Sequence, residues 1–97
     1  NEVIKVLRIS CIDQDENLVV LRLDGKISGT CVSNLREECL RYKNEYKQIT
    51  VLDFSGVTYI DPDGVKMLED IKDERVNIVN CQLFIKTLLG DLVKEEQ

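Results

Sequence analysis

The sequence predicts an α/β domain that contains a small mixed β-sheet of about four strands together with three helices. Short runs of β-branched and apolar residues are separated by longer segments in which apolar residues recur every three or four positions, the spacing of an amphipathic helix. The chain has 97 residues, and its 43% of apolar against 32% of charged residues is typical of a globular protein. We therefore expect residues 1–97 to form a single domain.

The first two predicted strands form a hairpin. The run VIKVLRISCI at residues 3–12 is rich in β-branched residues and leads into the polar turn DQDEN. The next run, LVVLRLDG at residues 18–25, places Val19, Leu21 and Leu23 on one face. Because a five-residue polar turn joins the two runs, we expect them to pair with each other.

The apolar period changes after Gly25, and the sequence predicts a helix over residues 28–47 with Ser28 as its N-cap. The inward stripe of this helix is expected to consist of Val32, Leu35, Cys39, Tyr42 and Tyr46. Charged residues occupy its other faces, which we interpret as a solvated surface.

A third strand is predicted at residues 49–56, where the short apolar run ITVLDFSG ends at a Ser-Gly turn signal. Such a run is typical of a central strand that is covered on at least one face. Since a helix separates it from the second strand, the two strands are expected to be parallel and joined by a right-handed crossover.

The stretch TYIDPDGVKML begins the second predicted helix. Asp61 is placed to act as its N-cap, Pro62 as the first helical residue and Asp63 as a first-turn carboxylate that faces the positive end of the helix dipole. The helix is expected to run to about Arg75. Its core side is predicted to carry Val65, Leu68 and Ile71. Met67 is predicted to lie at the edge of the apolar arc, where it is exposed and can contact a partner.

A short strand at residues 76–80, VNIVN, precedes a last helix that starts at about Gln82. The predicted inward stripe of this helix consists of Cys81, Phe84, Ile85, Leu88 and Leu92. Three further apolar residues, Leu83, Leu89 and Val93, widen the stripe beyond what one core contact needs. The helix is therefore expected either to fill a groove of its own domain or to present an apolar partner surface. Gly90 predicts an end or a kink.

Charge and hydropathy exclude two classes of partner. The chain has 13 Lys and Arg against 18 Asp and Glu, a net charge of -5, and it contains no basic cluster that would bind nucleic acid or an anionic membrane surface. No apolar run approaches the ~18 residues of a membrane span, so we expect no membrane insertion. The chain is interpreted as cytoplasmic.

Cysteine spacing and the absence of histidine argue against a metal site or a cofactor. The four cysteines, Cys11, Cys31, Cys39 and Cys81, form no Cys-x-x-Cys pair. Cys31 and Cys39 lie eight residues apart in one predicted helix, roughly 12 Å, which is too far for a disulfide. Each cysteine is interpreted as a small buried apolar residue.

The sequence also predicts that the protein is not an enzyme, with no catalytic residues. It has no histidine to act as a general base and no Gly-x-Ser-x-Gly elbow to hold a nucleophile. Asp53 with Asp61 and Asp63 is the best acidic constellation, and it suggests at most a site for a hard metal ion. These carboxylates are better explained as strand-end and helix-cap groups.

Two motifs resemble a known family. The segment LRLDGKIS, followed by a helix and then by VLDFSGVTYIDPDGVKML, is similar to the STAS domain, named for sulphate transporters and anti-sigma factor antagonists. The resemblance covers nearly the whole chain and is most specific from Asp53 to Leu68. It implies a compact α/β domain that binds other proteins in bacterial signalling and transcription regulation and does not catalyse a reaction. An accessory domain of a transport system or of a larger sensor complex is the alternative that it implies.

In the anti-sigma factor antagonist branch, the resemblance implies a switch at the start of the second helix. A serine or threonine one residue before the glycine is phosphorylated there by a partner, an anti-sigma factor kinase. In this chain that position is Asp63, which a serine kinase cannot modify. Asp63 is then a favourable first-turn residue only, a fixed mimic of the phosphorylated state, or part of an edge that docks a partner without any switch. The predicted partner-binding residues are Asp61, Pro62, Asp63, Gly64, Lys66 and Met67.

Overall fold

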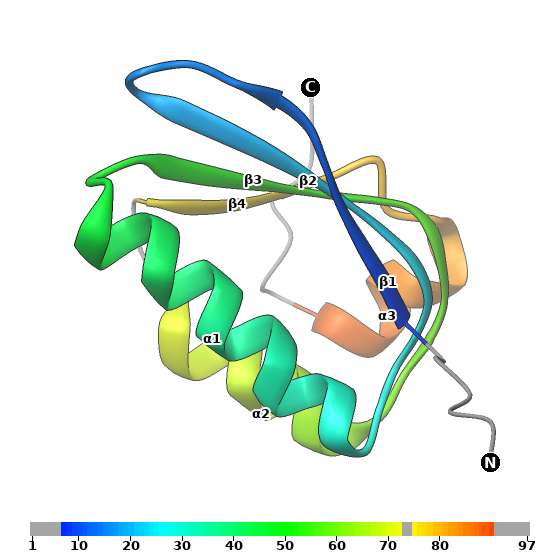
Figure 1. The fold of residues 1–97 in the computed structure, drawn as a ribbon. Helices are drawn as coiled ribbons and strands as arrows, with labels where there is room; N and C mark the ends of the chain where they lie inside the picture. The colour runs from blue at the N-terminus through cyan, green and yellow to red at the C-terminus, as the bar shows by residue number, and fades with distance from the viewer. Residues whose placement is uncertain (1–6, 73–74, 91–97) are drawn as a thin grey trace, which may run out of the picture.

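A computed structural model describes residues 7–72 and 75–90 of the chain (Figure 1). In chain order the elements are β1 (Leu7–Gln14), β2 (Leu18–Ile27), α1 (Thr30–Glu45), β3 (Ile49–Ile60), α2 (Pro62–Ile71), β4 (Val76–Val79) and α3 (Leu83–Leu89). The sheet order is β1-β2-β3-β4, in which β1 and β2 are antiparallel and the other two pairs are parallel. The predicted α/β class, with four strands in a mixed sheet and three helices, is confirmed.

The hairpin of β1 and β2 forms because Asp15 builds a turn between the strands. Its Oδ1 accepts hydrogen bonds from the backbone N–H groups of Asn17, at 2.8 Å, and Leu18, at 2.9 Å. The strand register shifts between Cys11 and Asp13, a β-bulge on the edge of the sheet. The first residues of the predicted strand, 3–6, lie outside the described residues.

The helices α1 and α2 pack against one face of the sheet, as Figure 1 shows. The predicted inward face of β2 is confirmed, since Val19, Leu21 and Leu23 are all buried in the core. They share this core with residues of β3 and of all three helices, among them Leu35, Leu52, Phe54, Leu68 and Ile85. The domain therefore has one core between the sheet and its helices.

Helix α1 begins later than predicted, and Ser28 is not its N-cap. The N-cap is Gly29, whose φ of 59° lies in the left-handed region, and no side chain caps the helix. Glycine adopts this conformation at little cost, so the turn out of β2 is made there. The predicted stripe is buried at Leu35, Cys39 and Tyr42, whereas Tyr46 lies past the last helical residue and is half exposed.

Strand β3 continues to Ile60, through the Ser-Gly step that was predicted to be a turn. Gly56 is needed there because β2 approaches closely. A Cβ atom at Gly56 would lie 1.9 Å from Oδ1 of Asp24 and 2.9 Å from the carbonyl oxygen of Leu23. The glycine signal therefore marks a close approach of two strands, and the prediction of a turn was wrong.

The end of α2 and the buried side of α3 both differ from the predictions. Helix α2 ends at Ile71, because Lys72 already has an extended backbone, and not at about Arg75. In α3 the buried residues are Ile85 and Leu89, whereas Phe84 and Leu88, which were predicted to point inward, are 51% and 45% exposed. The seven-residue helix packs against β3, and Phe84 and Leu88 of the predicted stripe face outward; Leu92 and Val93 lie outside the described residues. Gly90, with φ 61°, ends the helix.

The cysteines do not all behave as predicted. All four thiols are free, and Cys39 is buried as expected. Cys31 and Cys81 are partly exposed, and Cys11 is exposed. Cys11 lies on the edge strand β1 beside the bulge, paired with Leu21 of β2 on one side only.

Candidate functional site

The start of α2 has the cap that the sequence predicts. Oδ1 of Asp61 accepts a hydrogen bond from the backbone N–H of Gly64 at 2.7 Å, and Pro62 is the first helical residue. The backbone carbonyl of Asp61 accepts the N–H of Val65 at 3.0 Å. The first turn of α2 is thereby fixed directly after β3.

The same aspartate also holds the segment that leads into α1. Its Oδ2 accepts the backbone N–H of Gly29 at 3.3 Å, and its own backbone N–H donates to the carbonyl oxygen of Ile27 at 3.0 Å. The hydrogen bonds of Asp61 therefore hold the β2–α1 connection next to the start of α2, at one edge of the molecule. Sequence reasoning missed Ile27 and Gly29, which lie more than thirty positions before Asp61. Gly29, next to the predicted helix start, was the available signal.

Gly64 lets the first turn of α2 lie close to the ends of β2 and β3. A Cβ atom there would be 2.8 Å from Cγ1 of Ile60, 3.1 Å from Cγ2 of Ile27 and 3.2 Å from the carbonyl oxygen of Ile27. Any side chain at this position must push these groups apart. The glycine thus has a packing reason that the sequence alone did not give.

Exposure divides the six predicted partner-binding residues. Pro62, Asp63 and Lys66 are exposed, Asp61 is partly buried, and Gly64 is buried. Met67, which was predicted at the edge of the apolar arc and available to a partner, is buried at 5% exposure and belongs to the core. It lies one turn from Gly64 and Ile71 on the inward side of α2, so its predicted exposure is wrong.

The predicted acidic constellation does not form one site. Asp53 lies within β3, eight residues before Asp61, which corresponds to roughly 25 Å along a continuous strand. Because the predicted turn is absent, Asp53 is separated from Asp61 and Asp63. Over residues 7–72 and 75–90, no three acidic or cysteine side chains gather closely enough to hold a metal ion.

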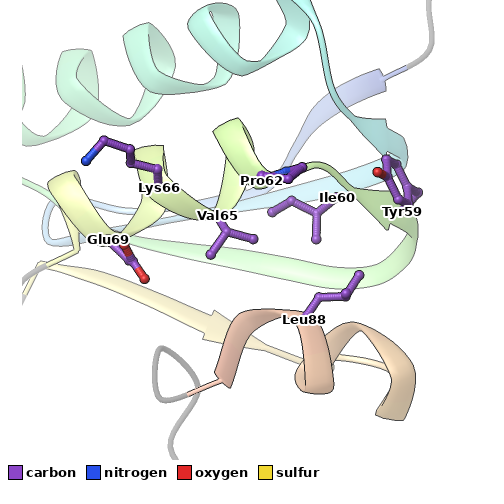
Figure 2. A pocket seen from close by; sticks show the side chains of 7 residues that line it. All are labelled: Tyr59, Ile60, Pro62, Val65, Lys66, Glu69 and Leu88. Atoms are coloured by element: carbon purple, nitrogen blue, oxygen red, sulfur yellow. The ribbon is translucent and has the colours of Figure 1, made fainter.

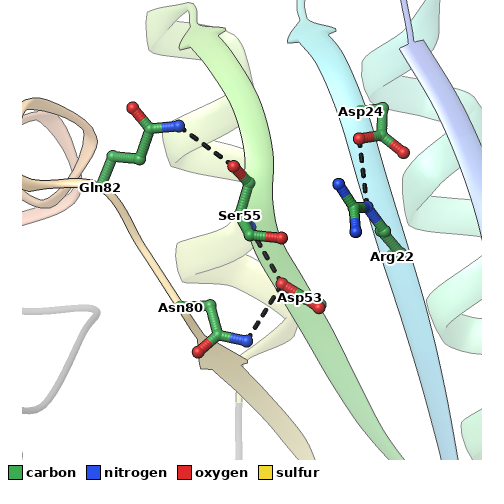
Figure 3. Close-up of polar contacts among 6 residues, drawn as sticks. All are labelled: Arg22, Asp24, Asp53, Ser55, Asn80 and Gln82. Atoms are coloured by element: carbon green, nitrogen blue, oxygen red, sulfur yellow. Dashed lines mark hydrogen bonds and ion pairs between the residues drawn. The ribbon is translucent and has the colours of Figure 1, made fainter.

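Asp53 instead belongs to a polar group on the sheet face that Figure 3 shows in front of the helices. Its Oδ1 accepts the backbone N–H of Ser55 at 2.9 Å and Nδ2 of Asn80 at 3.2 Å. Partial burial favours the neutral acid, but these hydrogen bonds and the charge of Arg22 outweigh it, so the pKa of Asp53 lies below its ordinary value. Figure 3 also shows Arg22 paired with Asp24 at 3.2 Å.

The family model described as STAS domain matches residues 11–92. The chain belongs to the STAS domain family. Both resembling motifs, and the whole edge built around Asp61, fall inside the matched residues of this STAS domain.

Solved structures show the same fold as this STAS domain. The anti-sigma factor antagonist SpoIIAA in its unphosphorylated form superposes with a TM-score of 0.63 at 16% identity, over 93% of this chain and 90% of that chain. The Bacillus cell fate determinant SpoIIAA in the phosphorylated form gives a TM-score of 0.59 at 16% identity, over 94% and 91%. Comparison with curated proteins finds no match. None of the described helices of the STAS domain combines the length and apolar character that crossing a bilayer requires.

Proposed function

We propose that this STAS domain is a regulatory protein-interaction module that acts as an anti-sigma factor antagonist, without catalytic activity. Its partner is a protein, an anti-sigma factor kinase, that docks on the N-terminal edge of α2. The fold likeness to SpoIIAA supports this choice. The observation that carries it is the double role of Asp61, which caps α2 and holds Gly29 at the start of α1. A rigid edge of this kind suits recognition by a partner.

The proposed docking edge consists of Gly29, Pro62, Asp63 and Lys66, with Asp61 and Gly64 fixing its backbone from beneath. Asp63 and Lys66 place opposite charges three residues apart on the exposed side of α2. Charged groups at the rim of an interface contribute more to partner selection and association rate than to affinity. Met67 supports this edge from the core and is not part of the contact.

Asp63 acts in this proposal as a fixed negative charge at the position before Gly64. Its carboxylate is exposed and accepts no hydrogen bond from the described residues, unlike that of Asp61. A phosphorylated serine would carry nearly two negative charges there, and Asp63 carries one. The protein then resembles the phosphorylated state in part and binds its kinase partner weakly.

Asp63→Ser tests both the partner and the role of the charge. The variant is titrated calorimetrically with the anti-sigma factor kinase encoded in the same genome, before and after incubation with ATP, and mass spectrometry detects phosphate. We expect the variant to bind about tenfold more tightly than the natural protein and to lose this gain once it is phosphorylated. The natural protein should acquire no phosphate at residues 61–64, because none of these residues has a hydroxyl group.

A matched control is Asp70→Ser, which removes another exposed carboxylate from α2 outside the docking edge and should leave the affinity unchanged. Tighter binding by the natural protein would show that the Asp63 carboxylate contacts the partner directly and would refute the mimic. Equal affinities of the two forms would leave Asp63 with the helix dipole as its sole role, worth about 0.3–1 kcal/mol. Co-purification with a transporter permease or ATPase, and no binding to the kinase, would overturn the antagonist function.

A further inference from the structure

Helix α3 has the smallest buried side of the three described helices. Of its seven residues only Ile85 and Leu89 are buried, whereas α1 buries three residues and α2 buries four. On the other side of α3, Leu83, Phe84 and Leu88 are 79%, 51% and 45% exposed. An isolated helix of this length does not persist in water, so α3 depends on its attachment to the sheet.

Two side-chain hydrogen bonds join the segment before α3 to strand β3, and we call this pair of bonds the latch. Nδ2 of Asn80 donates to Oδ1 of Asp53 at 3.2 Å, and Nε2 of Gln82 donates to the backbone carbonyl oxygen of Ser55 at 3.1 Å. Figure 3 shows both bonds between β3 and the chain that enters α3. Gln82 is the N-cap residue of α3, but its side chain caps no helical N–H group and is therefore available to the latch.

The chain changes direction at Asn80, between β4 and α3. Strand β4 is paired with β3 as far as Val79, which lies opposite Asp53. The next residue, Asn80, has φ 59°, in the left-handed region that asparagine adopts more readily than most residues with a side chain. The first latch bond therefore holds the residue at which the chain leaves the sheet.

On its side toward α2, helix α3 forms one wall of a groove instead of packing closely. The groove has a volume of about 380 Å³, and it is lined by Leu88 of α3, Ile60 at the end of β3 and Val65 of α2. Figure 2 shows Leu88 and Val65 extending into this space from the two helices. Because side chains that line a gap lose part of their van der Waals attraction, this side of α3 contributes little to its attachment.

We propose that α3 is a lid that opens as one unit about Asn80, while the sheet, α1 and α2 stay folded, and that the latch holds this lid closed. With the latch formed, the chain that enters α3 lies against β3, and Ile85 and Leu89 pack in the core. Once both latch bonds are broken, these two buried side chains alone oppose rotation of the helix. An element with few buried apolar side chains opens at a lower free energy than the core of the same domain.

Opening of the lid changes the surface next to the proposed docking edge. It removes the Leu88 wall of the groove and uncovers Val65 together with Ile60, which is 2% exposed when the lid is closed. Pro62 and Lys66 of the docking edge line the same groove. The inference goes beyond the proposed function, because opening is a property of this chain alone and does not require that a kinase docks.

Native-state hydrogen exchange of the whole chain, followed by NMR, tests the lid. The reporting amides are those of Lys86, which donates to the carbonyl oxygen of Gln82 at 2.9 Å, and of Gly90, which donates to that of Lys86. We expect both to exchange at least tenfold faster than the amides of β2, which is paired on both sides, and to share one opening equilibrium. Their exchange should depend only weakly on urea, because opening of the lid exposes little surface.

Two variants, Asn80→Gly and Gln82→Ala, each remove one latch bond. Glycine keeps the positive φ of residue 80 without steric cost, so the side-chain bond is what this variant loses. We expect each variant to speed the exchange of Lys86 and Gly90 about threefold to tenfold, the effect of one hydrogen bond. Asn34→Ala, which removes an exposed amide group from α1, is the matched control and should leave these rates unchanged.

Val19→Ala separates opening of the lid from unfolding of the whole domain. Val19 is buried and pairs with Thr50, at the end of β3 remote from Ile60. It should speed exchange in β2 and leave that of Lys86 and Gly90 unchanged, because it weakens the open-lid and closed-lid domains alike. Equal acceleration of β2 and α3 would show that α3 opens only when the domain unfolds. That result, unchanged exchange in both latch variants, or faster exchange of Gly90 alone by fraying of the last turn would overturn the proposal.

Discussion

At the scale of single residues, the Asp61 carboxylate joins the beginnings of two helices. One oxygen accepts the N–H of Gly64 in α2, and the other accepts the N–H of Gly29 before α1. Each of these donors is a backbone group that a helix or turn would otherwise leave to water. The neighbouring Gly64 has an equally specific reason, since it allows α2 to contact Ile27 and Ile60.

Gly64→Ala should destabilise the domain, although alanine is the better helix former. The gain in helix propensity is at most about 1 kcal/mol, whereas overpacking against Ile60 and Ile27 costs about 1–3 kcal/mol. We expect a net loss of about 1 kcal/mol in urea denaturation. Asn34→Ala, at an exposed position of α1, should be neutral or slightly stabilising. A Gly64→Ala protein as stable as the natural one would disprove the tight contact.

At the scale of elements, helix α2 has a buried side and an exposed side. Its inward side carries Met67, Leu68 and Ile71, all of them buried, and its outward side carries Asp63 and Lys66. The two sides differ in what a substitution should change. Substitutions on the inward side should change stability, and under the proposed function substitutions on the outward side should change partner binding.

Met67→Ala should therefore change stability and Lys66→Glu should change partner binding, although the residues are adjacent. Truncation of the buried Met67 leaves a cavity and should lower the free energy of unfolding by about 2–5 kcal/mol. Charge reversal at the exposed Lys66 should change it by no more than about 0.5 kcal/mol, and it should weaken binding of the partner to the docking edge. Urea denaturation and calorimetric titration measure the two quantities. A stable Met67→Ala protein would place Met67 outside the core.

At the scale of the whole molecule, the sheet and its helices enclose one core, and the cysteine side chains report on it. Cys39 on α1 is 1% exposed, whereas Cys11 on the edge strand β1 is exposed. Burial, with a smaller contribution from the charge of Glu38, raises the pKa of the Cys39 thiol from 9.0 to about 12. A thiol reacts as the thiolate, so both the burial and the raised pKa of Cys39 slow its reaction.

We expect iodoacetamide at pH 8 to label Cys11 rapidly and Cys39 only when the domain opens globally, as mass spectrometry of digested protein will show.

Because the folded-state pKa of Cys39 is raised, its stabilising effect is complete below pH 9.0 and is lost as the pH rises toward about 12. Unfolding free energies should therefore fall above pH 9.0, and Cys39→Ala should show a smaller fall. Labelling of Cys39 as fast as that of Cys11 in native buffer would contradict its burial.

The sequence by itself determined the class of fold, the family and the local start of α2. Periodicity is a property of neighbouring residues, so it predicted the hairpin, the inward face of β2 and the order of elements. The cap at Asp61 and the role of Pro62 were also predictable, because capping depends on residues within one turn.

The tertiary structure alone decided the rest. Gly56 was predicted to mark a turn and instead lies where β2 approaches β3, and Met67 was predicted at an edge and lies in the core. The link from Asp61 to Gly29 and the groove between α2 and α3 also join segments that are distant in the sequence. The local sequence pattern predicts which helix or strand a residue belongs to and which face of that element it occupies. Contact with a distant segment decides whether that face packs against a neighbour or is exposed to water.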